Sequence, residues 1–224
     1  MNHWLPWLSD ASPLPDLQVQ WLFHALAWLA LLTWCSVAFV PVQDRRWRWL
    51  VCSVGWAVLL FVWVEVLSGL GLAFQTPSLM TLCACVAAAW RDMRGTPTRL
   101  FYTTRPAKVS AILWACIAGT GWLLVLDAFG QLPVALYPLG FSQTIVWLAW
   151  LVCMLWLVSA YMLDAEEWHV QAAGCWLLAS CVFVFTRAPS GNAWDAWLDP
   201  WLWLFANAQL ARMAWRQRSR NNHS

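Results

Sequence analysis

The chain has 224 residues, of which 62% are hydrophobic and only 11% are charged, and its formal net charge is +2. A soluble domain would be about 45–50% apolar and about 25% charged, so the composition excludes an ordinary soluble globular protein. A charge this close to zero gives no reason to expect a nucleic-acid partner. Composition instead predicts an all-α polytopic membrane protein that exposes apolar surface to the lipid bilayer.

Seven apolar runs follow one another along the chain. A helix needs about 20 apolar residues to cross the hydrocarbon core of a bilayer. The runs cover residues 19–41, 48–73, 76–90, 108–128, 141–163, 168–186 and 194–214, and the third is short. We therefore expect a seven-helix transmembrane domain over residues 18–214. An interfacial segment, 1–17, precedes it and a basic cytoplasmic tail, 215–224, follows it.

The basic residues predict the orientation of these helices. Twelve of the 13 Lys and Arg residues lie in three clusters, at 45–48, 91–108 and 212–220, and Arg187 is the exception. Basic residues concentrate on the cytoplasmic side of a membrane protein. Seven crossings with the N-terminus outside place all three clusters inside, whereas a third run that did not cross would turn the 91–108 cluster outward. We expect an integral protein of the bacterial inner membrane, without a cleavable signal peptide, because residues 1–17 contain no Lys or Arg.

Cysteine and tryptophan are both abundant. All eight cysteines lie in apolar runs, so we interpret them as small buried hydrophobic residues and not as a disulfide framework. The 22 tryptophans fit the preference of this residue for membrane interfaces. The abundance of Trp, Ala and Arg, with a single Lys, is also typical of proteins encoded by GC-rich genomes. An aromatic-lined pocket for a lipid or a flat cofactor is the alternative interpretation.

Polar residues in several apolar runs are expected near the outer side of the membrane. Ionisable groups are costly inside a bilayer and are therefore candidates for function. The candidate cluster comprises His24, Glu65, Asp127, Arg187, Asp195, Asp199 and Asn207. Glu65, for example, lies 17 residues into the second run, about 25 Å from its inner end.

The last of these runs adds a periodicity. Asp195, Asp199, Trp203 and Asn207 recur every four residues, which would place them on one face of a helix. One interpretation is structural, with Arg187 paired to Asp195 or Asp199, and His24 paired to Glu65, because buried polar groups need partners. The others are an outward-facing binding or catalytic pocket and a proton path.

Several cofactors are excluded by residue type and position. The only lysine, Lys108, lies at an inner helix end and cannot form the Schiff base of a retinal protein. His24 and His169 lie at opposite depths and cannot share a haem iron. No zinc-protease, serine-hydrolase or phosphate-binding motif occurs. We therefore expect no cofactor and no metal.

Three functions remain open. The first is an accessory subunit or assembly factor of a membrane complex that handles envelope lipid or glycan, with a membrane-protein partner. The second is a small transporter or carrier whose polar site lies in the outer half of the membrane. The third is a membrane enzyme that acts on a lipid-linked substrate at the outer leaflet, where Arg187 would hold a phosphate and Glu65 or His24 would act as base. A lipid or a small hydrophobic molecule is the expected ligand.

Overall fold

The computed structural model describes residues 14–37, 39–41, 43–95, 108–162 and 167–221, and in these ranges every regular element is helical. The expected all-α fold is thereby confirmed for the described residues. Most of the interfacial segment predicted for residues 1–17, and the basic residues Arg99 and Arg105, lie outside them. The elements are α1 (Leu17–Val37), α2 (Arg45–Val62), α3 (Val64–Ala73), α4 (Leu79–Met93), α5 (Lys108–Ala128), η2 (Tyr137–Phe141), α6 (Gln143–Met162), α7 (Glu167–Thr186), α8 (Ala193–Trp197) and α9 (Pro200–Asn221).

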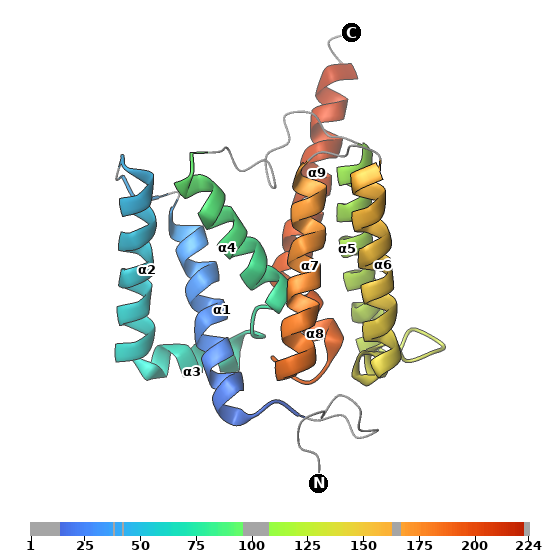
Figure 1. Cartoon of the computed structure of the whole chain (residues 1–224), viewed down its shortest axis with the longest axis horizontal. Helices are drawn as coiled ribbons and strands as arrows, with labels where there is room; N and C mark the ends of the chain where they lie inside the picture. Colours follow the sequence, from blue (N-terminus) through green and yellow to red (C-terminus); the bar gives the residue numbers. More distant parts are fainter. Residues whose placement is uncertain (1–13, 38, 42, 96–107, 163–166, 222–224) are drawn as a thin grey trace.

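The long helices alternate in direction, and α1 begins at the end of the bundle opposite to the one at which α9 ends (Figure 1). We call one end the basic end, because α2 begins there and α4 and α9 end there, in or beside the predicted basic clusters. We call the opposite end the loop end. It holds α3, η2, α8 and the connections between them. Figure 1 also shows α5 and α9 behind α6 and α7.

Membrane-crossing capacity is clearest in three helices. By length and hydropathy, Leu17–Val37, Ala111–Ala128 and His169–Thr186 can each cross a bilayer, and the bent pair α2–α3 makes a fourth span if counted as one. Gln143–Ser159 in α6 is apolar but shorter. A helical membrane bundle is therefore plausible. The count of seven crossings and their orientation remain predictions.

The second apolar run is not one straight helix. It bends by 93° between α2 and α3, and α3 lies across the loop end (Figure 1). The 18 residues of α2 already extend about 27 Å, close to the thickness of the hydrocarbon core. Beyond the bend, Leu67 packs with Leu60 and Trp28 in one buried cluster. Docking of α3 onto α1 therefore decides the turn, which no proline marks in the sequence.

The seventh run is also divided, contrary to the predicted single polar face. Residues Ala193–Trp197 form α8, and α9 begins only at Pro200. Proline is favoured in the first turn of a helix, and aspartate just before it caps the free backbone N–H groups. Asp195 and Asp199 thus precede α9, whereas Trp203 and Asn207 lie within it.

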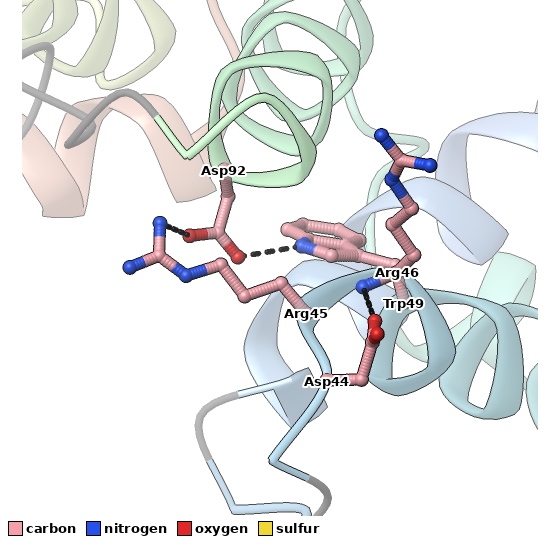
Figure 2. Close-up of polar contacts among 5 residues, drawn as sticks. All are labelled: Asp44, Arg45, Arg46, Trp49 and Asp92. Carbon is pink, nitrogen blue, oxygen red and sulfur yellow. Dashed lines mark hydrogen bonds and ion pairs between the residues drawn. The ribbon is translucent and has the colours of Figure 1, made fainter.

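The helix ends at the basic end are joined by polar contacts (Figure 2). Asp44 caps α2 by accepting a hydrogen bond from the Arg46 backbone N–H at 2.8 Å. Asp92 at the end of α4 accepts a hydrogen bond from Trp49 Nε1 at 2.8 Å and lies 3.8 Å from the Arg45 guanidinium (Figure 2). The two contacts of Asp92 fix α2 against α4.

All eight cysteines are free. The expectation that they are buried holds for half of them: Cys52, Cys85, Cys153 and Cys175. Cys35 and Cys116 are instead exposed on helix surfaces, where a thiol can face lipid as readily as it packs in a core.

Candidate functional site

Asp195 is the centre of a polar cluster at the loop end. Its carboxylate accepts hydrogen bonds from the Tyr137 hydroxyl at 2.8 Å, from Gln75 Nε2 at 3.1 Å and from the Ser190 hydroxyl. These donors come from three separate loop segments, and only 8% of Asp195 is exposed. The carboxylate therefore ties the α3–α4 turn, η2 and the α7–α8 loop together.

Asp199 joins the starts of two helices. It caps α9 by accepting from the Leu202 backbone N–H at 2.6 Å, and it also accepts from the backbone N–H of Ser78. Ser78 in turn caps α4 through its hydroxyl, which accepts from the Thr81 N–H at 3.0 Å. Asp199 is 2% exposed. One buried carboxylate thus orients α4 and α9 relative to each other.

The η2 segment is held in place by side chains that bind its backbone and the backbone of Leu136 before it. Asn192 donates from Nδ2 to the Tyr137 carbonyl at 3.0 Å, and Trp194 donates from Nε1 to the Leu136 carbonyl at 3.0 Å. Asp127 at the end of α5 accepts from the Tyr137 N–H at 2.7 Å. Asp127 therefore joins the cluster around Asp195 through Tyr137.

His24 lies beside the same turn but has unexpected partners. Its Nδ1 is 2.7 Å from the Thr76 hydroxyl, and its Nε2 is 3.1 Å from the Leu67 carbonyl. A carbonyl only accepts, so in a neutral ring Nε2 carries the proton and Nδ1 accepts from Thr76. The predicted His24–Glu65 pair does not form, because Glu65 is exposed in the first turn of α3.

The other predicted pair is absent as well. Among the described residues, no ion pair joins Arg187 to Asp195 or Asp199, and both carboxylates are occupied by neutral donors. Asn207 lies seven residues beyond Pro200 in α9, about 10 Å along its axis, and does not join the cluster. Its Nδ2 donates to the Trp203 carbonyl at 2.8 Å.

Five members of the cluster were missed by sequence reasoning: Gln75, Ser78, Tyr137, Ser190 and Asn192. They all lie in short connections next to Pro77, Pro138 and Pro189. Side chains that bind backbone or carboxylate groups are common in such turns, which is the signal that could have identified them. In the described part of the chain, no group of three His, Cys, Asp or Glu residues is arranged to hold a metal.

The Tyr137 hydroxyl gives the cluster a pH dependence. Burial, together with the adjacent Asp195 carboxylate, raises the pKa of Tyr137 from about 10 to about 12. The folded state therefore favours the protonated phenol. This contribution to stability is complete below pH 10 and is lost as the pH rises from about 10 to about 12.

We expect the Tyr137→Phe variant to lose this dependence. Its free energy of unfolding should be lower than that of the wild type at pH 8, because Asp195 loses a donor, but the difference should shrink between pH 10 and 12. Equilibrium unfolding in detergent micelles across pH 8–12 measures the free energy of unfolding of the wild type and of the variant. Tyr161→Phe is the control, because Tyr161 is 85% exposed on α6. A constant difference between wild type and Tyr137→Phe over this range would contradict the prediction.

A second feature is an apolar cavity between the helices, open to the outside where the lining residues Cys116, Leu148 and Val152 are exposed. Its volume is about 330 Å³, within the usual range of ligand pockets. Helices α4 to α9 all contribute to its lining. On α6 the lining runs from Ile145 to Trp156, about 17 Å along the helix axis, and Thr120 supplies its one hydroxyl group. The cavity is therefore elongated parallel to α6 and almost free of polar groups.

Five tryptophans line this cavity: Trp114, Trp156, Trp176, Trp194 and Trp197. Three of their edge-to-face contacts form a continuous series, Trp156–Trp176 at 6.3 Å, Trp176–Trp197 at 6.2 Å and Trp197–Trp194 at 6.0 Å between ring centroids. Such contacts add to the stability of aromatic packing. These four indoles therefore form one continuous part of the cavity wall.

The chain was also compared with known proteins. No family model, no curated protein sequence and no solved structure matches it.

Proposed function

We propose that this protein is a non-catalytic membrane protein that holds the hydrophobic chain of a lipid inside the bilayer, as an accessory component of a membrane complex. The observation that carries the proposal is the elongated apolar cavity of about 330 Å³ with its wall of five indoles. An acyl or isoprenoid chain has the matching chemistry, because it needs apolar contacts along its length and no hydrogen bonds.

The membrane assignment rests on the apolar helices and on the clustering of basic residues. Three helices can cross a bilayer, and the chain segments nearest the basic end carry most of the Arg residues. Positive residues favour the cytoplasmic side, so the basic end is proposed to face the cytoplasm of a bacterial cell. The loop end, with the cluster around Asp195, then faces outward.

The polar cluster supports the accessory role more than a transporter or an enzyme. Both alternatives require polar groups that a substrate can reach. The carboxylates of Asp195 and Asp199 are at least nine-tenths buried and accept hydrogen bonds from the protein itself. Groups used in this way stabilise the loop end and are not available to a ligand.

A photoreactive lipid tests the proposed cavity. Bilayer lipid touches the outside of every helix, so the decisive residues are those that a lipid reaches only through the cavity. Ala172 and Cys175 of α7 line the cavity and are less than 10% exposed, whereas Leu178 on the same helix is 55% exposed. A phospholipid with a diazirine in its acyl chain should label both positions, and peptide mass spectrometry separates them.

The Ala84→Phe variant should lose only the labelling inside the cavity. Ala84 lines the cavity from α4, and a phenyl group there occupies space that the chain would take. We expect adducts at Ala172 and Cys175 to fall about fivefold or more, with adducts at Leu178 unchanged. Val86→Phe is the matched control, since Val86 lies two residues away on α4 and is 57% exposed. Equal labelling of Ala172 in wild type and Ala84→Phe would refute the proposal.

The accessory role has its own test. Native mass spectrometry of protein extracted gently from its own membrane should retain a partner chain. Protein that leaves the membrane alone, with lipid bound, would support a lipid-binding function without a complex.

A further inference from the structure

A second, smaller pocket opens on the opposite side of α6. Its volume is about 190 Å³, and it is lined by Gln143, Val146, Trp147, Trp150, Val184, Phe185 and Arg187. The α6 residues that line it alternate with those lining the large cavity, so the two sites are separated by the helix itself. The pocket lies near the loop end, where α6 begins and α7 ends (Figure 1).

Arg187 is the unusual residue of this pocket. It is only 5% exposed, and its Nε has no hydrogen-bond partner. Its guanidinium carbon lies 5.3 Å from the centroid of the Phe183 ring, which is a cation–π contact. Arginine stays charged in proteins. A buried Nε–H without an acceptor is costly, because the group loses its hydration and gains no compensating hydrogen bond.

The backbone holds Arg187 in this position. Its N–H donates to the Phe183 carbonyl at 2.7 Å, and its own carbonyl accepts from the Gly191 N–H at 2.7 Å. Its φ of 55° lies in the left-handed region, which non-glycine residues seldom adopt. The turn that follows α7 therefore fixes the backbone of Arg187 beside the pocket.

Trp150 adds a second donor of the same kind. Its Nε1 is buried and has no partner among the described residues. A buried indole N–H normally finds an acceptor. Arg187 and Trp150 both line this pocket, and each holds one buried N–H donor without a partner among the described residues. An anionic oxygen ligand would supply the missing acceptor.

We propose that this pocket binds the phosphate group of a membrane phospholipid, with Arg187 and Trp150 as donors. The guanidinium fork matches phosphate oxygens and binds them by charge-assisted hydrogen bonds. Trp147 and Phe185 flank the pocket and are 55% and 78% exposed, so they present apolar surface to the glycerol and acyl parts of the same lipid. The site does not depend on the large cavity, because different residues on the other side of α6 form it.

Native mass spectrometry in mild detergent with defined lipids tests this proposal. Phosphatidylglycerol should remain bound to the wild-type protein, and diacylglycerol, which lacks the phosphate, should not. Arg187→Gln should weaken retention of phosphatidylglycerol about tenfold or more, because a charge-assisted bond is lost. Trp150→Phe should weaken it less. The matched control is Arg218→Gln, which removes the same charge from the exposed end of α9 at the basic end.

The outcomes separate the sources of the phosphate. If inorganic phosphate at millimolar concentration displaces the lipid as efficiently as excess lipid does, the site takes free phosphate and the lipid assignment is overturned. Equal lipid retention in wild type and Arg187→Gln would overturn the site altogether. If Arg187→Gln does not fold, Arg187→Lys and Trp150→Phe decide: unchanged retention in both variants overturns the proposal. Labelling of Ala172 from the large cavity should be unaffected in every variant, which distinguishes this site from the proposed function.

Discussion

Replacing Asp199 with alanine is expected to lower the free energy of unfolding by about 3 kcal/mol or more, since two hydrogen bonds to a buried carboxylate are lost together. The side chain caps α9 at Leu202 and also accepts from the Ser78 N–H at the start of α4. Without it, the Ser78 N–H stays buried and unpaired, because Ser78 is fully buried, and the Leu202 N–H in the first turn of α9 loses its cap. The loss should appear in equilibrium unfolding in mixed detergent micelles.

Two further variants identify the cause of this loss. Asp199→Asn keeps one acceptor oxygen, so it should lower the free energy of unfolding by less than Asp199→Ala does. Glu65→Ala removes an exposed carboxylate from α3 and should change the stability by less than about 0.5 kcal/mol. A loss from Glu65→Ala as large as that from Asp199→Ala would show that removal of negative charge, and not the double cap, determines the stability.

Gly140→Ala is expected to lower the free energy of unfolding by about 2–4 kcal/mol, from overpacking together with lost hydrogen bonds. A Cβ atom at this position would overlap Asn192 Oδ1 and lie 2.5 Å from Trp194 Cδ1. Asn192 has no exposed surface and cannot move away without breaking its bonds to Tyr137 and to the Trp194 N–H. The variant should therefore loosen η2 from α8.

Gly119→Ala is the matched control for this substitution. A Cβ at Gly119 in α5 meets no atom within 4 Å, so alanine should be neutral or should stabilise the helix by up to about 1 kcal/mol. Tryptophan fluorescence during unfolding measures both variants. If Gly140→Ala is as stable as Gly119→Ala, then close contact between η2 and α8 is not required for folding.

Most helix positions could be predicted from the sequence. The apolar runs at 108–128, 141–163 and 168–186 correspond to α5, α6 and α7 within two residues at each end. Helix formation in such a run depends on local properties, namely its length, its hydropathy and the charges beside it. The division of the seventh run was also marked locally, by the sequence Asp199–Pro200, although the four-residue periodicity obscured it.

The bend after α2 could not be predicted in this way. Residues 56–68 contain no glycine or proline, and Glu65 is the one charged residue among them. The bend follows from packing of Leu67 against α1, whose His24 also binds the Leu67 carbonyl. The bend therefore depends on contacts between residues that are more than 40 positions apart in the sequence.

The sequence by itself determined that the described chain is helical and where most helices begin and end, because each of these follows from neighbouring residues. It also placed Asp127, Asp195, Asp199 and His24 at one end. Only the tertiary structure decided their partners: turn residues bind both carboxylates of the seventh run, and Arg187 lies in a separate pocket. Partner choice depends on helix rotation and on distances between remote segments. Periodicity along one helix does not contain that information, and the same reason explains why the apolar cavity appears only once the helices pack.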